Sequence, residues 1–282
     1  MTGTISTLTR FSEDVPANLP PPEQIVALCK EAGYNRHGIP FIGPFGAVLA
    51  WFKYGPHVTL DEAFTQVWVA RHLNAKPEDG VKVPQVFMAF TSPHPACTIG
   101  FIIMEYIAAP DCTSGDYERV AQAVNTLIRI KAPNSVPGPI GGGAVVHSFF
   151  PEWTSGIRYK TSKELQSHLN QILKINKDNK RVSFEAEGLY LCPVDINPGH
   201  FKKLEDGRIV VLDFRATCFL PESFIAYAMQ KPVHKFKQMV AKYVNYPASN
   251  NVEAMAVASG YLVYYGRSNI GLPTNVLRRM RR

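Results

Sequence analysis

Two stretches of the sequence decide the fold: Leu191-Cys192-Pro193-Val194-Asp195-Ile196-Asn197-Pro198-Gly199-His200-Phe201 and Ile209-Val210-Val211-Leu212-Asp213-Phe214-Arg215. In each, an aspartate follows a short apolar run, and the two aspartates are eighteen residues apart. Between them, Glu205-Asp206-Gly207-Arg208 predicts a tight hairpin turn that brings the second run back beside the first. A carboxylate at the end of a buried strand is costly unless it meets a cation, a metal ion or hydrogen-bond donors. The pattern therefore indicates a reactive centre around these two carboxylates.

Kinase-type sites use such a pair of aspartates. One carboxylate accepts the proton of the attacking hydroxyl or orients it, and the second holds Mg²⁺ against the phosphates of the nucleotide. Two spaced aspartates alone also fit a bland interpretation, with Asp195 in a turn and Asp213 as a helix or turn cap. Further motifs elsewhere in the sequence are needed to distinguish these two interpretations.

Size, charge and cysteines narrow the class of protein. The 282 residues are 46% hydrophobic and 19% charged, which suits a globular chain of two lobes or two domains. The net charge is +7, and four of the positive charges belong to the C-terminal arginines Arg278, Arg279, Arg281 and Arg282. We expect a solvated end there, with no nucleic-acid or membrane partner. Five scattered cysteines predict neither disulfides nor a zinc site, and no signal peptide is visible, so we expect a cytoplasmic protein.

The order of predicted elements changes from β-rich to helical along the chain. Thr59 and Glu62 have the spacing of a capping box, which predicts a helix over 59–74. We predict an α+β, two-lobed fold, with residues 1–105 as a β-rich lobe and 106–282 as a helical lobe that carries both aspartates. Strands are expected at 47–53, 83–90 and 98–106, and further helices at 23–32, 117–131 and 163–175.

Four motifs resemble, in the same order, those of the aminoglycoside-phosphotransferase and choline-kinase-like family, which has a protein-kinase-like fold. Leu191–Phe201 resembles the catalytic loop of that family, and Asp213-Phe214-Arg215 resembles its metal-binding segment. Phe52–Pro56, with the acidic helix that follows, resembles the lysine strand seen especially in fungal members. Ile103–Ile107 resembles the hinge that receives adenine. Four collinear motifs over about residues 43–228 are more specific than any one of them.

The resemblance implies roles for the acidic and polar residues of both aspartate stretches. Asp195 would be the catalytic base that activates the acceptor hydroxyl. Asp213 would coordinate Mg²⁺, and Asn197 and His200 are further candidate ligands for the metal. The acceptor would be a small molecule, and the sequence predicts nothing about the oligomeric state.

The resemblance also implies a site for ATP in the first lobe. Lys53 would contact the α- and β-phosphates and pair with Glu62, although Asp61 competes for this role because the helix register is open. The adenine would be lined, mostly through backbone groups, by Met104, Glu105 and Tyr106.

Several residues depart from the pattern of the family. Pro193-Val194 stands where the family has His-Gly, and His200 stands where it has an Asn, a better ligand for Mg²⁺ than imidazole. Only Gly43-Pro44-Phe45-Gly46 takes the place of a phosphate-covering glycine loop, and Arg215 follows the metal-binding aspartate. Three hypotheses remain open: an ATP- and Mg²⁺-dependent small-molecule kinase, a binding module or pseudokinase without turnover, and a lyase or cyclase of secondary metabolism on the same fold.

Overall fold

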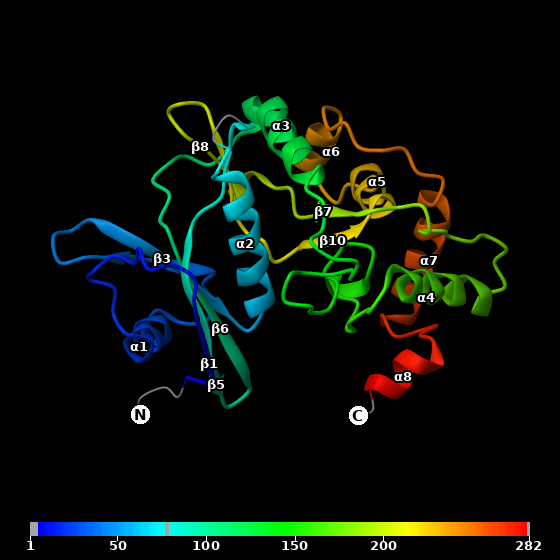
Figure 1. Ribbon diagram of the computed structural model, residues 1–282, viewed down its shortest axis with the longest axis horizontal. Coiled ribbons are helices and arrows are strands. Elements are labelled where there is room, and N and C mark those ends of the chain that lie inside the picture. The colour runs from blue at the N-terminus through cyan, green and yellow to red at the C-terminus, as the bar shows by residue number, and fades with distance from the viewer. Residues whose placement is uncertain (1–4, 77–78, 281–282) are drawn as a thin grey trace. The chain divides into compact units, whose positions relative to one another are not determined.

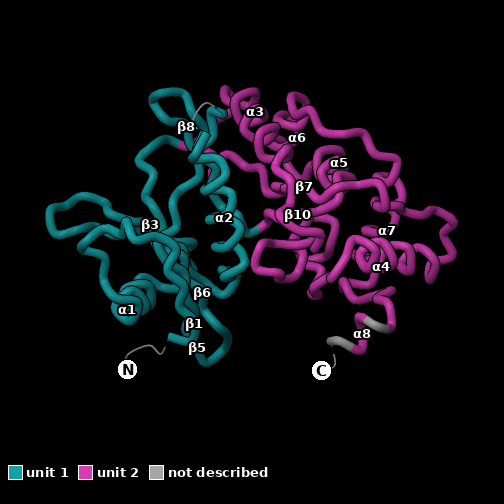
Figure 2. The backbone as a smooth tube through the Cα atoms, in the orientation of Figure 1, with its two compact units in different colours: residues 1–110, 202–215 teal, residues 111–201, 216–282 magenta. Residues whose placement is uncertain are grey.

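The computed structural model describes residues 5–76 and 79–280 (Figure 1). The fold is α+β, as predicted, and the chain divides into two compact units (Figure 2). The first unit comprises Met1–Pro110 and Lys202–Arg215, and the second comprises Asp111–Phe201 and Ala216–Arg282. The expected boundary at 105/106 differs from this division, because the segment that carries Asp213 returns to the first unit. Arg281 and Arg282 lie outside the described residues.

The first unit is built on a five-stranded antiparallel sheet in the order β1-β5-β6-β3-β2. Its strands are β1 (Thr7–Arg10), β2 (Gly38–Ile42), β3 (Val48–Gly55), β5 (Val86–His94) and β6 (Cys97–Met104). Successive side chains of β3 point to opposite faces of the sheet. Phe52 therefore packs with Ile25 and Cys29 of helix α1 (Pro22–Ala32), whereas Trp51 packs with Ala63 of helix α2 (Leu60–Leu73). Each face of the sheet is thus covered by one helix.

Helix α2 begins where the sequence predicts. The Thr59 side chain accepts the backbone N–H of Glu62 at 3.2 Å, which confirms the predicted cap. The loop before the helix lies against Gly100 of β6, where an added Cβ would stand 2.0 Å from the carbonyl oxygen of Val58. A side chain does not fit at this position, so glycine lets the loop approach the sheet and fixes the start of α2 near the end of β3.

A second, three-stranded sheet explains why residues 202–215 belong to the first unit. Strand β9 (Ile209–Val211) pairs in parallel with β4 (Val81–Lys82), and β8 (Phe201–Lys203) lies on the other side of β9. The predicted hairpin turn is present, with the N–H of Leu204 donating to the carbonyl of Arg208 at 3.0 Å. Strand β9 ends at Val211, and Asp213 follows two residues beyond it.

The second unit is mainly helical and surrounds a two-stranded antiparallel ribbon. Strand β7 (Leu189–Pro193) pairs with β10 (Thr217–Pro221), and helices α3 and α5 pack against this ribbon. The helices of the unit are α3 (Tyr117–Ile128), α4 (Ser162–Ile175), α5 (Glu222–Gln230), α6 (Lys235–Ala241), α7 (Val252–Tyr265) and α8 (Thr274–Met280). Short 3-10 turns occupy Ser114–Asp116, Pro151–Trp153 and Pro198–His200.

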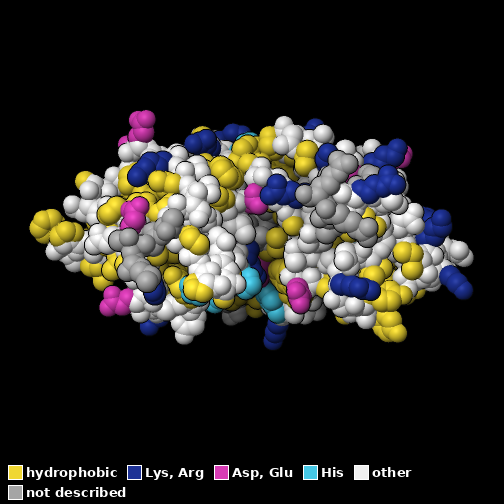
Figure 3. Space-filling view, turned by 90° about the horizontal axis from the view of Figure 1, so that it is seen from below, with side chains coloured by type: hydrophobic (Ala, Val, Ile, Leu, Met, Phe, Trp, Pro, Cys, Tyr) yellow, Lys and Arg dark blue, Asp and Glu magenta, His cyan; other side chains and the backbone are white. Residues whose placement is uncertain are grey.

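On the face drawn in Figure 3, Lys and Arg side chains are scattered among polar and apolar ones and do not form a single basic patch. None of the helices within residues 5–76 and 79–280 is long and apolar enough to cross a membrane.

Candidate functional site

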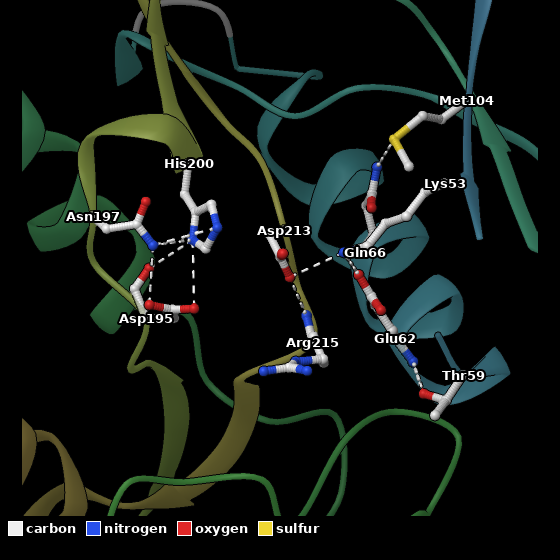
Figure 4. Close-up of polar contacts among 10 residues, drawn as sticks. All are labelled: Lys53, Thr59, Glu62, Gln66, Met104, Asp195, Asn197, His200, Asp213 and Arg215. Carbon is white, nitrogen blue, oxygen red and sulfur yellow. Dashed lines mark hydrogen bonds and ion pairs between the residues drawn. The ribbon is translucent and has the colours of Figure 1, made fainter. Parts of the chain in front are cut away.

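The first unit brings three predicted residues together around one ammonium group (Figure 4). Lys53 lies on β3, on the sheet face that α2 covers, and its Nζ contacts Oε1 of Glu62 at 2.5 Å and Oδ1 of Asp213 at 3.0 Å. The register of α2 thus places Glu62, and not its neighbour Asp61, in the ion pair with Lys53. A single lysine therefore connects the sheet, the helix and the segment after β9.

Burial and charge oppose each other in this group. Burial raises the pKa of Glu62, the Lys53 ammonium counteracts that rise, and the Asp213 carboxylate adds to it. Burial also disfavours charged Lys53, but the two carboxylates outweigh it and raise the pKa of Lys53. Oε2 of Glu62 is buried without a hydrogen-bond partner. The Arg215 guanidinium also lowers the pKa of Glu62. The two carboxylates of the group are ligands of the kind that a divalent cation prefers.

The backbone at Asp213 is unusual. Its φ is +56°, in the left-handed region that residues other than glycine adopt infrequently. The same Oδ1 that contacts Lys53 also accepts the backbone N–H of Arg215 at 3.1 Å. These two contacts fix the orientation of the carboxylate. Strained backbone of this kind costs about 1–3 kcal/mol and is concentrated at functional sites.

The predicted adenine-lining segment begins at Met104, the last residue of β6, and continues beyond the strand. The Met104 sulfur lies 3.5 Å from Nε2 of Gln66 on α2. The Glu105 carboxylate pairs with Lys82, and its backbone N–H donates to the carbonyl of Gln85 at 2.8 Å. The carboxylate and the backbone N–H of Glu105 are therefore both bonded to other residues of the first unit.

An aromatic pair adjoins this segment. The ring of Tyr106 stacks on Trp51, with centroids 6.5 Å apart and an interplanar angle of 29°. Trp51 precedes Lys53 by two residues and so shares its face of the sheet. The indole also lies against Gly38, where an added Cβ would stand 2.7 Å from it. The aromatic faces of such a pair can stack on a planar base.

The glycine-rich segment Gly43–Gly46, the candidate for a phosphate-covering loop, lies elsewhere on the sheet. Gly43–Gly46 forms the turn between β2 and β3, with the N–H of Gly46 donating to the carbonyl of Gly43 at 3.0 Å. Lys53 is opposite Gly38, at the other end of β2. The segment next to Lys53 is therefore the loop before β2, residues 33–37, which the sequence did not single out.

The second unit brings together the other three predicted residues, directly after β7 (Figure 4). Nδ2 of Asn197 donates to Oδ1 of Asp195 at 3.0 Å. The 3-10 turn Pro198–His200 returns the chain, so Nδ1 of His200 lies 3.0 Å from the backbone oxygen of Asp195 and 3.7 Å from its Oδ2. Asp195, Asn197 and His200 thus form one polar cluster.

Some of the residues predicted to bind the metal ion have donor atoms of the kind that Mg²⁺ prefers. Mg²⁺ prefers oxygen and is held in many sites by one or two carboxylates together with substrate phosphates. The Asp213 carboxylate and the Asn197 amide oxygen are ligands of this kind, whereas the His200 imidazole is not. Among the described residues there is no cluster of three or more His, Cys, Asp or Glu side chains able to hold a metal ion. A magnesium ion would therefore depend on phosphate oxygens for most of its ligands.

Sequence reasoning missed Lys237 on α6. Its side chain is completely buried, and its Nζ donates to the carbonyl oxygen of Val194, the residue before Asp195, at 2.9 Å. Lys235 and Lys237 are two residues apart and both are of a type that is almost never fully buried without a partner, so the sequence carries no signal that one of them is buried.

The strand lysine, the helix glutamate and the aspartate after a strand form one group of ion pairs in the first unit. No family model matches the chain, and no curated protein matches it. Among solved structures, the chain is similar to a thermostable mutant of the aminoglycoside phosphotransferase APH(4)-Ia in its apo form, with 13% identity, 98% of this chain and 96% of that chain covered, and a TM-score of 0.48.

Two further solved structures are also similar to the chain. The putative fructosamine-3-kinase from Haemophilus somnus 129PT has 14% identity, 82% and 83% coverage of this chain and that chain, and a TM-score of 0.42. The choline kinase LicA from Streptococcus pneumoniae has 12% identity, 91% and 96% coverage and a TM-score of 0.40. At such low identity and TM-scores, function has to be argued from the residues of this chain.

Proposed function

We propose that the protein transfers the γ-phosphoryl group of ATP to a hydroxyl group of a small molecule. The observation that carries the proposal is the position of Lys53 between the Glu62 and Asp213 carboxylates. A buried lysine held by a helix glutamate is the arrangement that kinases use to bind nucleotide phosphates.

On the nucleotide side, Lys53 would bind the phosphates and Glu62 would keep its ammonium in place. Asp213 would hold Mg²⁺ together with the phosphate oxygens of the nucleotide. Bound Mg²⁺ supplies neutralisation of the negative charge on the phosphates. Trp51 and Tyr106 offer the aromatic surface for the base.

On the acceptor side, Asp195 would accept the proton of the attacking hydroxyl. The hydroxyl oxygen forms a bond to the γ-phosphorus, the bond from that phosphorus to the β,γ-bridging oxygen breaks, and ADP leaves. The Asn197 amide holds one oxygen of the Asp195 carboxylate. The other oxygen can then receive the proton, as a general base requires.

A nucleotide-binding module without turnover is the second candidate. It is favoured by the contacts of Asp195, whose carboxylate and backbone oxygen are both approached by neighbouring side chains, Asn197 and His200. In this alternative Lys53 and Asp213 keep their roles and Asp195 has none.

Nucleotide binding and turnover test the two candidates in sequence. We expect ATP with Mg²⁺ to raise the melting temperature of the wild type, because a ligand present at about 100 times its Kd stabilises the folded state by about 2.7 kcal/mol. Asp213→Ala should lose this shift, whereas Asp79→Ala, a change at an exposed aspartate of the same unit, should keep it. If the wild type does not bind nucleotide, both candidate functions are wrong. Binding without phosphoryl transfer across a broad panel of acceptor alcohols would favour the second.

A further inference from the structure

Lys237 is a buried cation with no carboxylate at ion-pair distance in the part of the chain that the structure describes. It is 0% exposed, and its Nζ donates a hydrogen bond to the carbonyl oxygen of Val194. No ion pair reaches this ammonium from any described residue. Burying an unpaired charge is costly, and the pKa of Lys237 is lowered by burial to about 8. An apolar side chain of similar length would fill the same space at less cost, so a lysine at this buried position calls for a reason.

The hydrogen bond from Lys237 is accepted by the peptide unit that joins Val194 to Asp195. The Val194 carbonyl belongs to the same peptide plane as the N–H of Asp195, so holding that oxygen fixes the plane from which the aspartate departs. On its other side, the N–H of Val194 donates to the carbonyl of Ala216 at 3.0 Å. Both polar groups of Val194 are thus held: its N–H by Ala216 beside β10, and its carbonyl oxygen by Lys237 of α6 and by the N–H of Ile196 at 3.1 Å.

The start of α6 carries a second uncompensated group. The Nδ1 atom of His234 accepts the backbone N–H of Lys237 at 3.3 Å, so a neutral ring carries its proton on Nε2. That Nε2 is buried and has no hydrogen-bond partner. His234 is also close enough to Asp195 and His200 to interact electrostatically with both. Two costly groups, one at the N-cap of α6 and one in its first turn, therefore both interact with the charge of Asp195.

We propose that Lys237 is a positioning residue for Asp195: its buried ammonium holds the Val194–Asp195 peptide and so sets the orientation of the carboxylate toward the acceptor hydroxyl. The inference rests on the proposed function, since it needs Asp195 to act on an acceptor. Lys237 does not touch the reacting atoms, because it is completely buried. Its effect is expected on the rate of transfer and not on the binding of nucleotide.

The test compares Lys237→Met with Lys235→Met, which removes an exposed lysine from the same helix. We expect Lys237→Met to lower kcat about 100-fold, the loss that a displacement of about 1 Å can cause, with KM for ATP unchanged. Lys237→Arg keeps a charged donor and should recover part of the rate, and Lys235→Met should behave as the wild type. A folded Lys237→Met variant with the kcat of the wild type overturns the proposal, as does a rise in KM for ATP at constant kcat.

If Lys237→Met does not fold, Lys237→Gln decides, because its amide still offers an N–H to Val194. A folded Gln variant within about tenfold of the wild-type kcat supports positioning through this bond, and one as inactive as Asp195→Asn overturns it.

A second readout separates this proposal from failure of the proposed function. The ring resonances of His200, which contacts the backbone oxygen of Asp195, should shift in a folded position-237 variant and stay in place in Lys235→Met. Unchanged His200 resonances in both variants overturn the proposal even if no acceptor is ever phosphorylated, whereas a wild type without ATP binding overturns only the proposed function.

Discussion

Replacing Lys53 with methionine should destabilise the first unit by an amount that depends on pH. The Lys53 and Glu62 side chains are 13% and 1% exposed, so the substitution leaves a buried carboxylate beside Asp213 without its ion-pair partner. Breaking a buried pair by removing one partner costs about 3–5 kcal/mol. Glu62 can escape part of this cost by binding a proton, since burial already raises its pKa. We therefore expect a loss of about 2–4 kcal/mol at pH 8.

The sign of the pH dependence follows from the raised pKa of Glu62 in the folded variant. A carboxyl group whose folded pKa lies above its unfolded value favours folding at low pH, and this contribution is lost as pH rises through the folded pKa. The destabilisation of Lys53→Met should therefore be smaller at pH 5 than at pH 8. In the double variant with Glu62→Gln, the buried charge is gone, and most of the loss at pH 8 should be recovered.

Urea unfolding at the two pH values measures these differences, with Lys76→Met as the control because Lys76 is an exposed lysine of the same unit. Coupling between the two positions is read from the double-mutant cycle. The reasoning is refuted if Lys53→Met is as stable as the wild type at pH 8. It is refuted equally if the loss is the same at both pH values and Glu62→Gln restores nothing.

Three further predictions concern other parts of the chain. Burial lowers the pKa of His168, which is hydrogen-bonded to Tyr159, to about 4; the resulting stability is present above pH 6.5 and is lost as pH falls from there toward 4. The free energy of unfolding should fall by about 3 kcal/mol over this pH range in the wild type. In His168→Gln, the midpoint of urea unfolding should not show this fall. Gly100→Ala should destabilise the chain by about 1–3 kcal/mol in thermal unfolding, because its Cβ meets the backbone of Val58. Titration with ATP should quench the fluorescence of Trp51, and Trp51→Ala should remove that change and weaken binding by about 1 kcal/mol; undiminished affinity in this variant would contradict a stacking role.

The parts of the site that could be predicted from sequence are those fixed by local pattern. The cap at Thr59 and the helical spacing after it place Glu62 in the first turn of α2, and the apolar run before Lys53 marks a strand. The distance between these elements in the chain is short, so their pairing follows from local geometry. The polar cluster of Asp195, Asn197 and His200 is local for the same reason.

The parts that could not be predicted depend on contacts between distant segments. The return of Asp213 to the first unit rests on a parallel pairing of β9 with Val81–Lys82, a strand too short to leave a pattern in the sequence. The register that places Gly38 beside Lys53, and the burial of Lys237, are likewise set by tertiary packing.

The first unit is discontinuous, and this affects how the chain can be made. Because domains fold during synthesis as their residues emerge from the ribosome, the nascent chain cannot complete this unit when residue 110 appears. It must wait for residues 202–215, so β4 has no partner strand and Lys53 only one of its two carboxylates until then. A translational pause before that segment would prolong a state in which β4 is an open edge, and such edges recruit other chains. Expression yield should therefore respond to synonymous codons between residues 110 and 202.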